Sequence, residues 1–200
     1  MRCGTGAMTG IEAAAAALGV VSVWLTIRQH LACWPTGIVM VALYAWVFFD
    51  ARLYADAGLQ VVFLGMQVYG WVHWRSGDAG GAGGVLPVVR LGRNQAVVWF
   101  AVLVLGTLAL GTATAAAGAA LPFVDAFQTV LSLIAQYLMA RKVLDSWLMW
   151  IVVDVVSIGM YLSKDLMITA ALYALFLGLA VAGLRAWRRS LAELAVPAAT

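Results

Sequence analysis

The chain has 200 residues, of which 64% are hydrophobic and only 10% are charged, with a formal net charge of +3. A soluble domain of this size carries about 25% charged residues, so the composition excludes a soluble protein and indicates one that crosses a bilayer repeatedly.

Seven apolar stretches follow one another along the chain. A helical crossing needs about 20 apolar residues, and a helix satisfies its own backbone polar groups within lipid. We predict an all-α integral membrane protein with spans at 9–27, 34–50, 55–74, 96–117, 122–140, 146–162 and 166–185. Polar residues interrupt the third and fifth spans. Between the third and fourth, residues 77–84 have the composition of a flexible linker.

Lysine and arginine are distributed unevenly over the loops. Cytoplasmic loops carry an excess of both. With the C-terminus inside, only Arg2, Arg52 and Lys164 of the 12 Lys and Arg residues fall on the outer side. We therefore expect an outer N-terminus and a cytoplasmic C-terminus. This orientation separates Cys3 (outside) from Cys33 (inner face), which excludes a bridge within one chain.

Residues 12–75 recur 113 positions later without a gap. The matches that chance explains least are Arg28 with Arg141, Trp34 with Trp147, Phe63 with Phe176, Gly65 with Gly178, Gly70 with Gly183, Trp74 with Trp187 and Arg75 with Arg188. The repeat relates spans 1–3 to spans 5–7. Because span 4 lies between them, the two copies run parallel.

The repeat divides the chain into four parts. We predict an N-terminal triple-helix repeat (1–75), a linker with connector span 4 (76–121), a C-terminal triple-helix repeat (122–189) and a cytoplasmic tail (190–200). The sugar facilitators called SWEETs share this three-one-three plan, but a plan alone does not give a function.

Asp154 is the most informative polar residue within the spans. It lies seven residues beyond Trp147, or about 10 Å deeper, and hence near the bilayer centre. A carboxylate there is costly unless it is paired, so it predicts a functional site; a hydrogen bond that joins two helices is the structural alternative. Its repeat mate is Val41, so the fold does not demand a carboxylate there.

Glutamines recur on neighbouring spans. Gln60 and Gln67 share one face of the third span, and Gln128 belongs to a polar stripe on the fifth. Gln60 aligns with Tyr173 and Gln128 with Ala15, so both break the repeat. We regard the three as candidate ligand contacts, with hydrogen bonds between helices as the alternative.

Aromatic and small residues suggest further roles. At the inner ends of their spans we expect an anchoring aromatic belt, formed by Trp34, Trp74, Trp147 and Trp187. Trp46 and Trp150 are better candidates for stacking on a planar ligand, especially a cationic one. We expect close helix packing at the repeated glycines, which are Gly65, Gly70, Gly178 and Gly183.

Several motifs resemble the PnuC family of bacterial vitamin transporters. They are Trp34-Pro35-Thr36-Gly37, residues 53–60, Tyr69-Gly70-Trp71-Val72-His73-Trp74, Ala140-Arg141-Lys142 and residues 147–154. The resemblance runs from about Trp34 to Arg189 and is weakest across the linker and span 4.

The resemblance implies a nicotinamide riboside transporter of the bacterial inner membrane, often a homotrimer. It implies facilitated diffusion that phosphorylation inside the cell makes unidirectional. The resemblance also implies that Trp150, Asp154 and Gln60 contact the ligand. Some relatives have Asn where this chain has Asp154, and others carry thiamine or riboflavin. An ionised Asp154 favours a cationic cargo, either nicotinamide riboside or thiamine.

We expect the aromatic residues Trp150, Trp46 and Tyr173 to sandwich the base. The glutamines Gln60, Gln67 and Gln128 would hold the ribose hydroxyls, and Asp154 would meet the cationic ring.

Other functions fit less well. A proton-coupled symporter usually needs a chain of buried ionisable groups, and Asp154 is the only deep one. An integral membrane enzyme lacks support, since His30 and His73 have no nucleophile or carboxylate cluster beside them. A scaffold would scatter its polar residues. We expect no cofactor, no metal and no nucleic-acid partner; the expected partners are a small vitamin, the lipid bilayer and further copies of the chain.

Overall fold

The computed structural model describes residues 10–78 and 86–195. Cys3, most of the predicted linker and the end of the predicted tail lie outside these ranges. The described chain forms seven helices: α1 (Gly10–Ile27), α2 (Cys33–Asp50), α3 (Tyr54–Asp78), α4 (Arg93–Ala116), α5 (Pro122–Ala140), α6 (Ser146–Ser163) and α7 (Met167–Ala195). All seven predicted spans are confirmed as helices, and α3 and α7 continue past the predicted ends of their spans.

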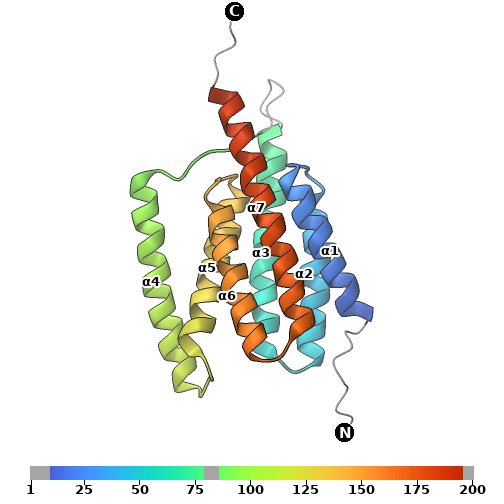
Figure 1. Cartoon of the computed structure of the whole chain (residues 1–200), viewed down its shortest axis with the longest axis vertical. Helices are drawn as coiled ribbons and strands as arrows, with labels where there is room; N and C mark the ends of the chain where they lie inside the picture. The colour runs from blue at the N-terminus through green and yellow to red at the C-terminus, as the bar shows by residue number, and fades with distance from the viewer. Residues whose placement is uncertain (1–9, 79–85, 196–200) are drawn as a thin grey trace, which may run out of the picture.

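Six of these helices are long and apolar enough to cross a membrane. The exception is α3, one of the two spans in which polar residues were expected to weaken the apolar signal; the other, α5, is apolar enough. It nevertheless runs beside the others (Figure 1) and packs against α2 and α5. Its neighbours therefore compensate for its lower hydropathy.

The helices of the two repeats form a closed ring. Within each repeat, α2 packs between α1 and α3, and α6 packs between α5 and α7. The ring closes where α1 meets α7 and where α3 meets α5. The repeat makes these two contacts equivalent, since α1 corresponds to α5 and α3 corresponds to α7. The ring therefore has an approximate twofold axis through its centre, along the helices.

Helix α4 lies outside the ring and contacts α5 (Figure 1). The contact is close because glycines of α4 face α5 side chains: Gly111 faces Phe123, and Gly106 faces Val130. Trp99 of α4 also lies 5.3 Å from Tyr137 of α5. This arrangement fits the predicted structural connector.

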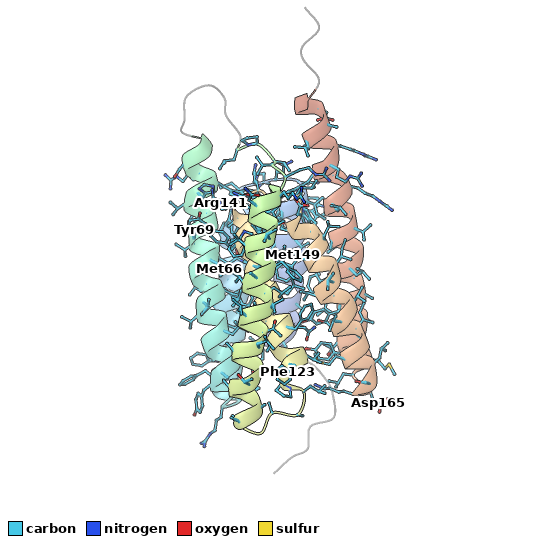
Figure 2. All side chains as sticks on the ribbon, turned by 90° about the vertical axis from the view of Figure 1, so that its left-hand side faces the viewer. Met66, Tyr69, Phe123, Arg141, Met149 and Asp165 are labelled. Carbon is cyan, nitrogen blue, oxygen red and sulfur yellow. The ribbon has the colours of Figure 1, made fainter. Side chains whose placement is uncertain are left out.

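The short turns between helices repeat as well. Non-glycine residues with positive φ are uncommon. Gln29 (φ 55°) and Lys142 (φ 53°) form one repeat-related pair, and Arg52 (φ 61°) and Asp165 (φ 57°) form the other. The first pair lies at the end of the ring where α7 ends, and the second lies at the opposite end; in Figure 2, Arg141 and Asp165 mark these two ends.

The end of the ring where α7 ends, which we call the tryptophan end, contains the main hydrophobic core. Trp34, Trp74, Trp147 and Trp187 are each 5% exposed or less. The expectation of a lipid-facing aromatic belt was therefore wrong: these rings pack on one another, with Trp34 edge-on to Trp74 and Trp147 edge-on to Trp187. Edge-to-face packing adds to the stabilisation from burial alone.

Two of the four repeated glycines make room for this core. Gly70 lies against the ring of Trp34, and Gly183 lies against the ring of Trp147, so each repeat packs a tryptophan on a glycine. At Gly65 and Gly178, a methyl group on the α-carbon would meet no neighbour within 4 Å, so close packing there was a wrong expectation. A bulky side chain at Gly70 or Gly183 would displace a buried indole.

Candidate functional site

Asp154 lies in the middle of α6 and is buried, with 4% of its surface exposed. No described residue donates a hydrogen bond to the carboxylate, and no described cation pairs with its charge. A structural carboxylate in this position would be expected to have a hydrogen-bonding partner. The geometry therefore fits a group that is completed by a ligand.

Gln128 of α5 is held against α6 beside Asp154. Its amide nitrogen donates a hydrogen bond to Ser157 Oγ at 2.7 Å and a longer one to the Val153 carbonyl oxygen at 3.5 Å. The amide oxygen of Gln128 is left to accept from a ligand hydroxyl. Ser157 was not among the residues expected from the sequence, although it lies three residues beyond Asp154 and thus on the same helix face.

Two stacked tyrosines lie between Asp154 and the end of the ring opposite the tryptophan end. Tyr173 of α7 stacks on Tyr161 of α6 with ring centroids 5.2 Å apart. Tyr173 also interacts electrostatically with Asp154 and with Tyr44 of α2. Three helices from both repeats thus bring three phenol groups together, and Tyr173 is the one that lies close to the carboxylate.

Gln67 and Trp150 occupy the level between Asp154 and the tryptophan end. Gln67 is buried, and its amide packs on Gly37, where a methyl group would lie 2.7 Å from the amide nitrogen. The repeat mates of Gly37 and Gln67 are Trp150 and Ala180. The sizes are thus exchanged between the repeats: the large residue is on α3 in the N-terminal repeat and on α6 in the C-terminal repeat. Trp150 is half-buried and packs against the tryptophan core.

The structure does not bring all the expected residues together. Trp46 is 65% exposed and lines an open apolar groove between α2 and α3, so it does not face the ring interior. This position separates Trp46 from the other candidate ligand contacts, and its stacking on the ligand stays an untested prediction. Gln60 is half-buried near the N-terminal end of α3 and forms no hydrogen bond with a described residue.

The chemistry of this group of residues is that of binding. Asp154 supplies one carboxylate, Gln67 and Gln128 supply amides, and Trp150 and Tyr173 supply aromatic faces. Among the described residues, no group of three His, Cys, Asp or Glu side chains could hold a metal ion. The arrangement suits a planar, cationic ligand that also carries hydroxyl groups, since the carboxylate, the aromatic faces and the amides each match one part of it.

Comparison with known proteins agrees with this architecture. The nicotinamide mononucleotide transporter family matches residues 9–189. The chain is 28% identical to the nicotinamide riboside transporter PnuC of Escherichia coli, over 93% of this chain and 88% of that protein. It is 26% identical to the riboflavin/roseoflavin transporter RibM of Streptomyces davaonensis, over 85% of this chain and 80% of that protein.

A solved structure is also similar. It is described as the crystal structure of the vitamin B3 transporter PnuC. The TM-score is 0.75 at 25% sequence identity, and the match covers 92% of this chain and 82% of the solved one. The likeness therefore extends over the whole ring of helices and is not confined to one repeat.

Proposed function

This chain belongs to the nicotinamide mononucleotide transporter family, and from that premise we propose that it carries nicotinamide riboside by facilitated diffusion. The family is one of multi-pass membrane transporters and not of enzymes, and its similar members carry vitamins. The specific cargo and the mechanism are our proposal.

The observation that carries the cargo is the partnerless carboxylate of Asp154 in the middle of the bilayer. Nicotinamide riboside has a pyridinium ring with a fixed positive charge. Placed beside Asp154, that ring would supply the missing charge partner and let the carboxylate remain ionised within the bilayer. The faces of Trp150 and Tyr173 would stack on the ring.

The amides would orient the sugar. Gln128 is fixed by Ser157, so its oxygen is positioned in advance for a ribose hydroxyl. Gln67 and Gln60 of α3 would supply the remaining polar contacts from the other repeat. A ligand without the ribose would leave these groups unsatisfied, and buried unpaired polar groups are costly.

The ring also supports alternating access. Two parallel repeats around one axis can rock against each other and open the centre to either side in turn. No coupled ion is needed in this scheme, and phosphorylation inside the cell would trap the cargo. We place the protein in the bacterial inner membrane as a homotrimer, with the N-terminus outside and the tryptophan end in the cytoplasm, as the distribution of Lys and Arg predicts.

Riboflavin is the second candidate cargo, since RibM is among the similar proteins. Riboflavin is neutral, so it would leave Asp154 without a charge partner. The carboxylate therefore favours the cationic vitamin over riboflavin.

The test is a binding panel on the purified protein in detergent by isothermal titration calorimetry. Nicotinamide riboside should bind most tightly, while nicotinamide (neither ribose nor fixed charge) and riboflavin (no charge) should bind at least tenfold more weakly. Thiamine is the informative competitor because it is cationic but lacks ribose. Tight binding of thiamine or riboflavin without binding of nicotinamide riboside would reassign the cargo within the family.

The transport mechanism needs its own assay. In liposomes, uptake of nicotinamide riboside should follow its gradient and be insensitive to a protonophore. Uptake that collapses with the protonophore would instead identify a proton-coupled symporter.

A further inference from the structure

Lys142 is a buried cation at the tryptophan end, in the turn between α5 and α6. Only 2% of its surface is exposed. Its Nζ donates hydrogen bonds to Gln29 Oε1 at 3.2 Å and to the Leu86 carbonyl oxygen at 3.0 Å, and it lies 4.4 Å from the ring centroid of Trp74. No described carboxylate forms an ion pair with it.

The position of this ammonium follows from the repeat. Gln29 and Lys142 are repeat mates, 113 residues apart, and they share the same positive φ. Two groups related by a twofold axis can touch only where both reach that axis. The contact between their side chains therefore lies at the centre of the ring, on the line along which a cargo would pass.

Other hydrogen bonds join the repeats at the same end. Trp74 Nε1 donates to the Ala140 carbonyl oxygen at 2.9 Å, and Trp187 Nε1 donates to the Thr26 carbonyl oxygen at 3.1 Å. Gln29 Nε2 donates to Ser190 Oγ at 3.0 Å. The amide of Gln29 thus connects Lys142 on one side with α7 on the other, and the repeats cannot separate here unless these bonds break.

The segment before α4 covers this contact. The backbone of Val89 exchanges two hydrogen bonds with the turn between α5 and α6, with Lys142 and Leu144 as its partners. The Leu91 amide also donates to Asp145 Oδ2 at 2.8 Å. This segment is therefore fixed to the C-terminal repeat, and Lys142 links it to the N-terminal repeat through Gln29.

We propose that Gln29 and Lys142 form the inner gate of the transport pathway, closed in this structure. The inference rests on the proposed function, which makes the ring centre a path and the tryptophan end its cytoplasmic exit. When the repeats separate at this end, the Gln29–Lys142 hydrogen bond breaks and the axis opens. Water then hydrates the ammonium of Lys142. This hydration offsets part of the lost hydrogen bonding, so the gate can open and close reversibly.

Cys33 provides a readout that needs no cargo. This thiol is 2% exposed and interacts electrostatically with Lys142. It becomes reachable from the cytoplasmic side only when the gate opens. We would measure its labelling by a membrane-impermeant maleimide in inside-out vesicles, at fixed pH and in a Cys3→Ser background.

Gln29→Met is the main variant because it keeps the length and neutrality of the side chain but removes both hydrogen bonds. Labelling of Cys33 should become about 25-fold faster, since two hydrogen bonds are lost and each contributes about fivefold. Ser190→Ala, a milder change that frees only one side of Gln29, should give a smaller acceleration in the same direction. Arg141→Gln is the matched control: this exposed neighbour bonds to Tyr137 of its own helix, and its loss should leave the labelling rate unchanged.

The opposite change should tighten the gate. Gln29→Glu places a carboxylate beside the ammonium and should slow nicotinamide riboside transport in liposomes about tenfold, with equilibrium binding retained.

Unchanged Cys33 labelling in folded Gln29→Met and Ser190→Ala proteins would overturn the gate, as would faster transport by Gln29→Glu than by the wild type. If the wild type does not move nicotinamide riboside at all, the proposed cargo fails, while the labelling experiment still decides the gate.

Discussion

The two repeats are alike at the tryptophan end and different in the middle of the ring. At the tryptophan end, each repeat packs a tryptophan on a glycine of the next helix: Trp34 on Gly70 and Trp147 on Gly183. In the middle, Val41 of one repeat corresponds to Asp154 of the other, and both are buried. The similarity describes a scaffold that both copies need, and the difference marks the place where one asymmetric molecule would bind.

The same contrast extends to hydrogen bonds. Ala15 and Tyr44 in the N-terminal repeat correspond to Gln128 and Ser157 in the C-terminal repeat, where the two side chains bond at 2.7 Å. An alanine and a tyrosine cannot make that bond. The C-terminal repeat thus carries the carboxylate and the bonded amide, and the N-terminal repeat contributes Gln60, Gln67 and Tyr44.

The largest effect should come from breaking the shared scaffold. Gly70→Ala and Gly183→Ala each push a methyl group into a buried indole and should destabilise the fold by about 1–3 kcal/mol. A thermal melt of the detergent-solubilised protein measures the loss.

Gly65→Ala and Gly178→Ala are the matched controls for that experiment. These glycines lie in the same helices but have open space around them, so alanine should leave the melting temperature unchanged or raise it slightly. Equal destabilisation by all four substitutions would contradict the assignment of the scaffold to the tryptophan–glycine contacts.

A smaller effect should follow when the middle of the ring is made symmetric. Gln128→Ala gives the C-terminal repeat the residue of its mate and should weaken nicotinamide riboside binding by up to about tenfold, since one oriented hydrogen bond is lost. The titration should be repeated with Ser157→Ala and with the double variant. Because Ser157 acts through Gln128, the double variant should bind no more weakly than Gln128→Ala; additive losses would show that the two act independently.

The smallest effect concerns the charge at the gate. Burial lowers the pKa of Lys142 to about 8, whereas the pKa of a lysine in an unfolded chain is about 10.4. Between these values the folded state binds fewer protons than the unfolded state, so this group makes the free energy of unfolding rise with pH. The titratable group that faces it is the Cys33 thiol.

Lys142→Gln removes that contribution and is structurally conservative, because Gln29 holds the same positive φ. The melting temperature of the wild type should rise relative to this variant by a few degrees between about pH 8 and pH 10. A constant difference between the two proteins over that range would contradict a buried, titrating ammonium.

Much of the fold could be predicted from the sequence because hydropathy and the repeat are local, one-dimensional signals. All seven helices, the parallel repeats and the burial of Asp154 follow from them. The burial of Trp34 and Trp147 could not be predicted, since an inner-end tryptophan looks the same whether lipid or another helix covers it. The exposure of Trp46 and the contact between Gln29 and Lys142 depend on how helices are rotated about their axes, which spacing along one helix does not give.

The central claim is that the breaks in the repeat form the binding site. Asp154→Val tests it most directly, because it installs the residue of the repeat mate and removes the partnerless charge without adding bulk. Calorimetric titration should show about 100-fold weaker binding of nicotinamide riboside, with an unchanged or higher melting temperature. Wild-type affinity in a folded Asp154→Val protein would contradict the claim.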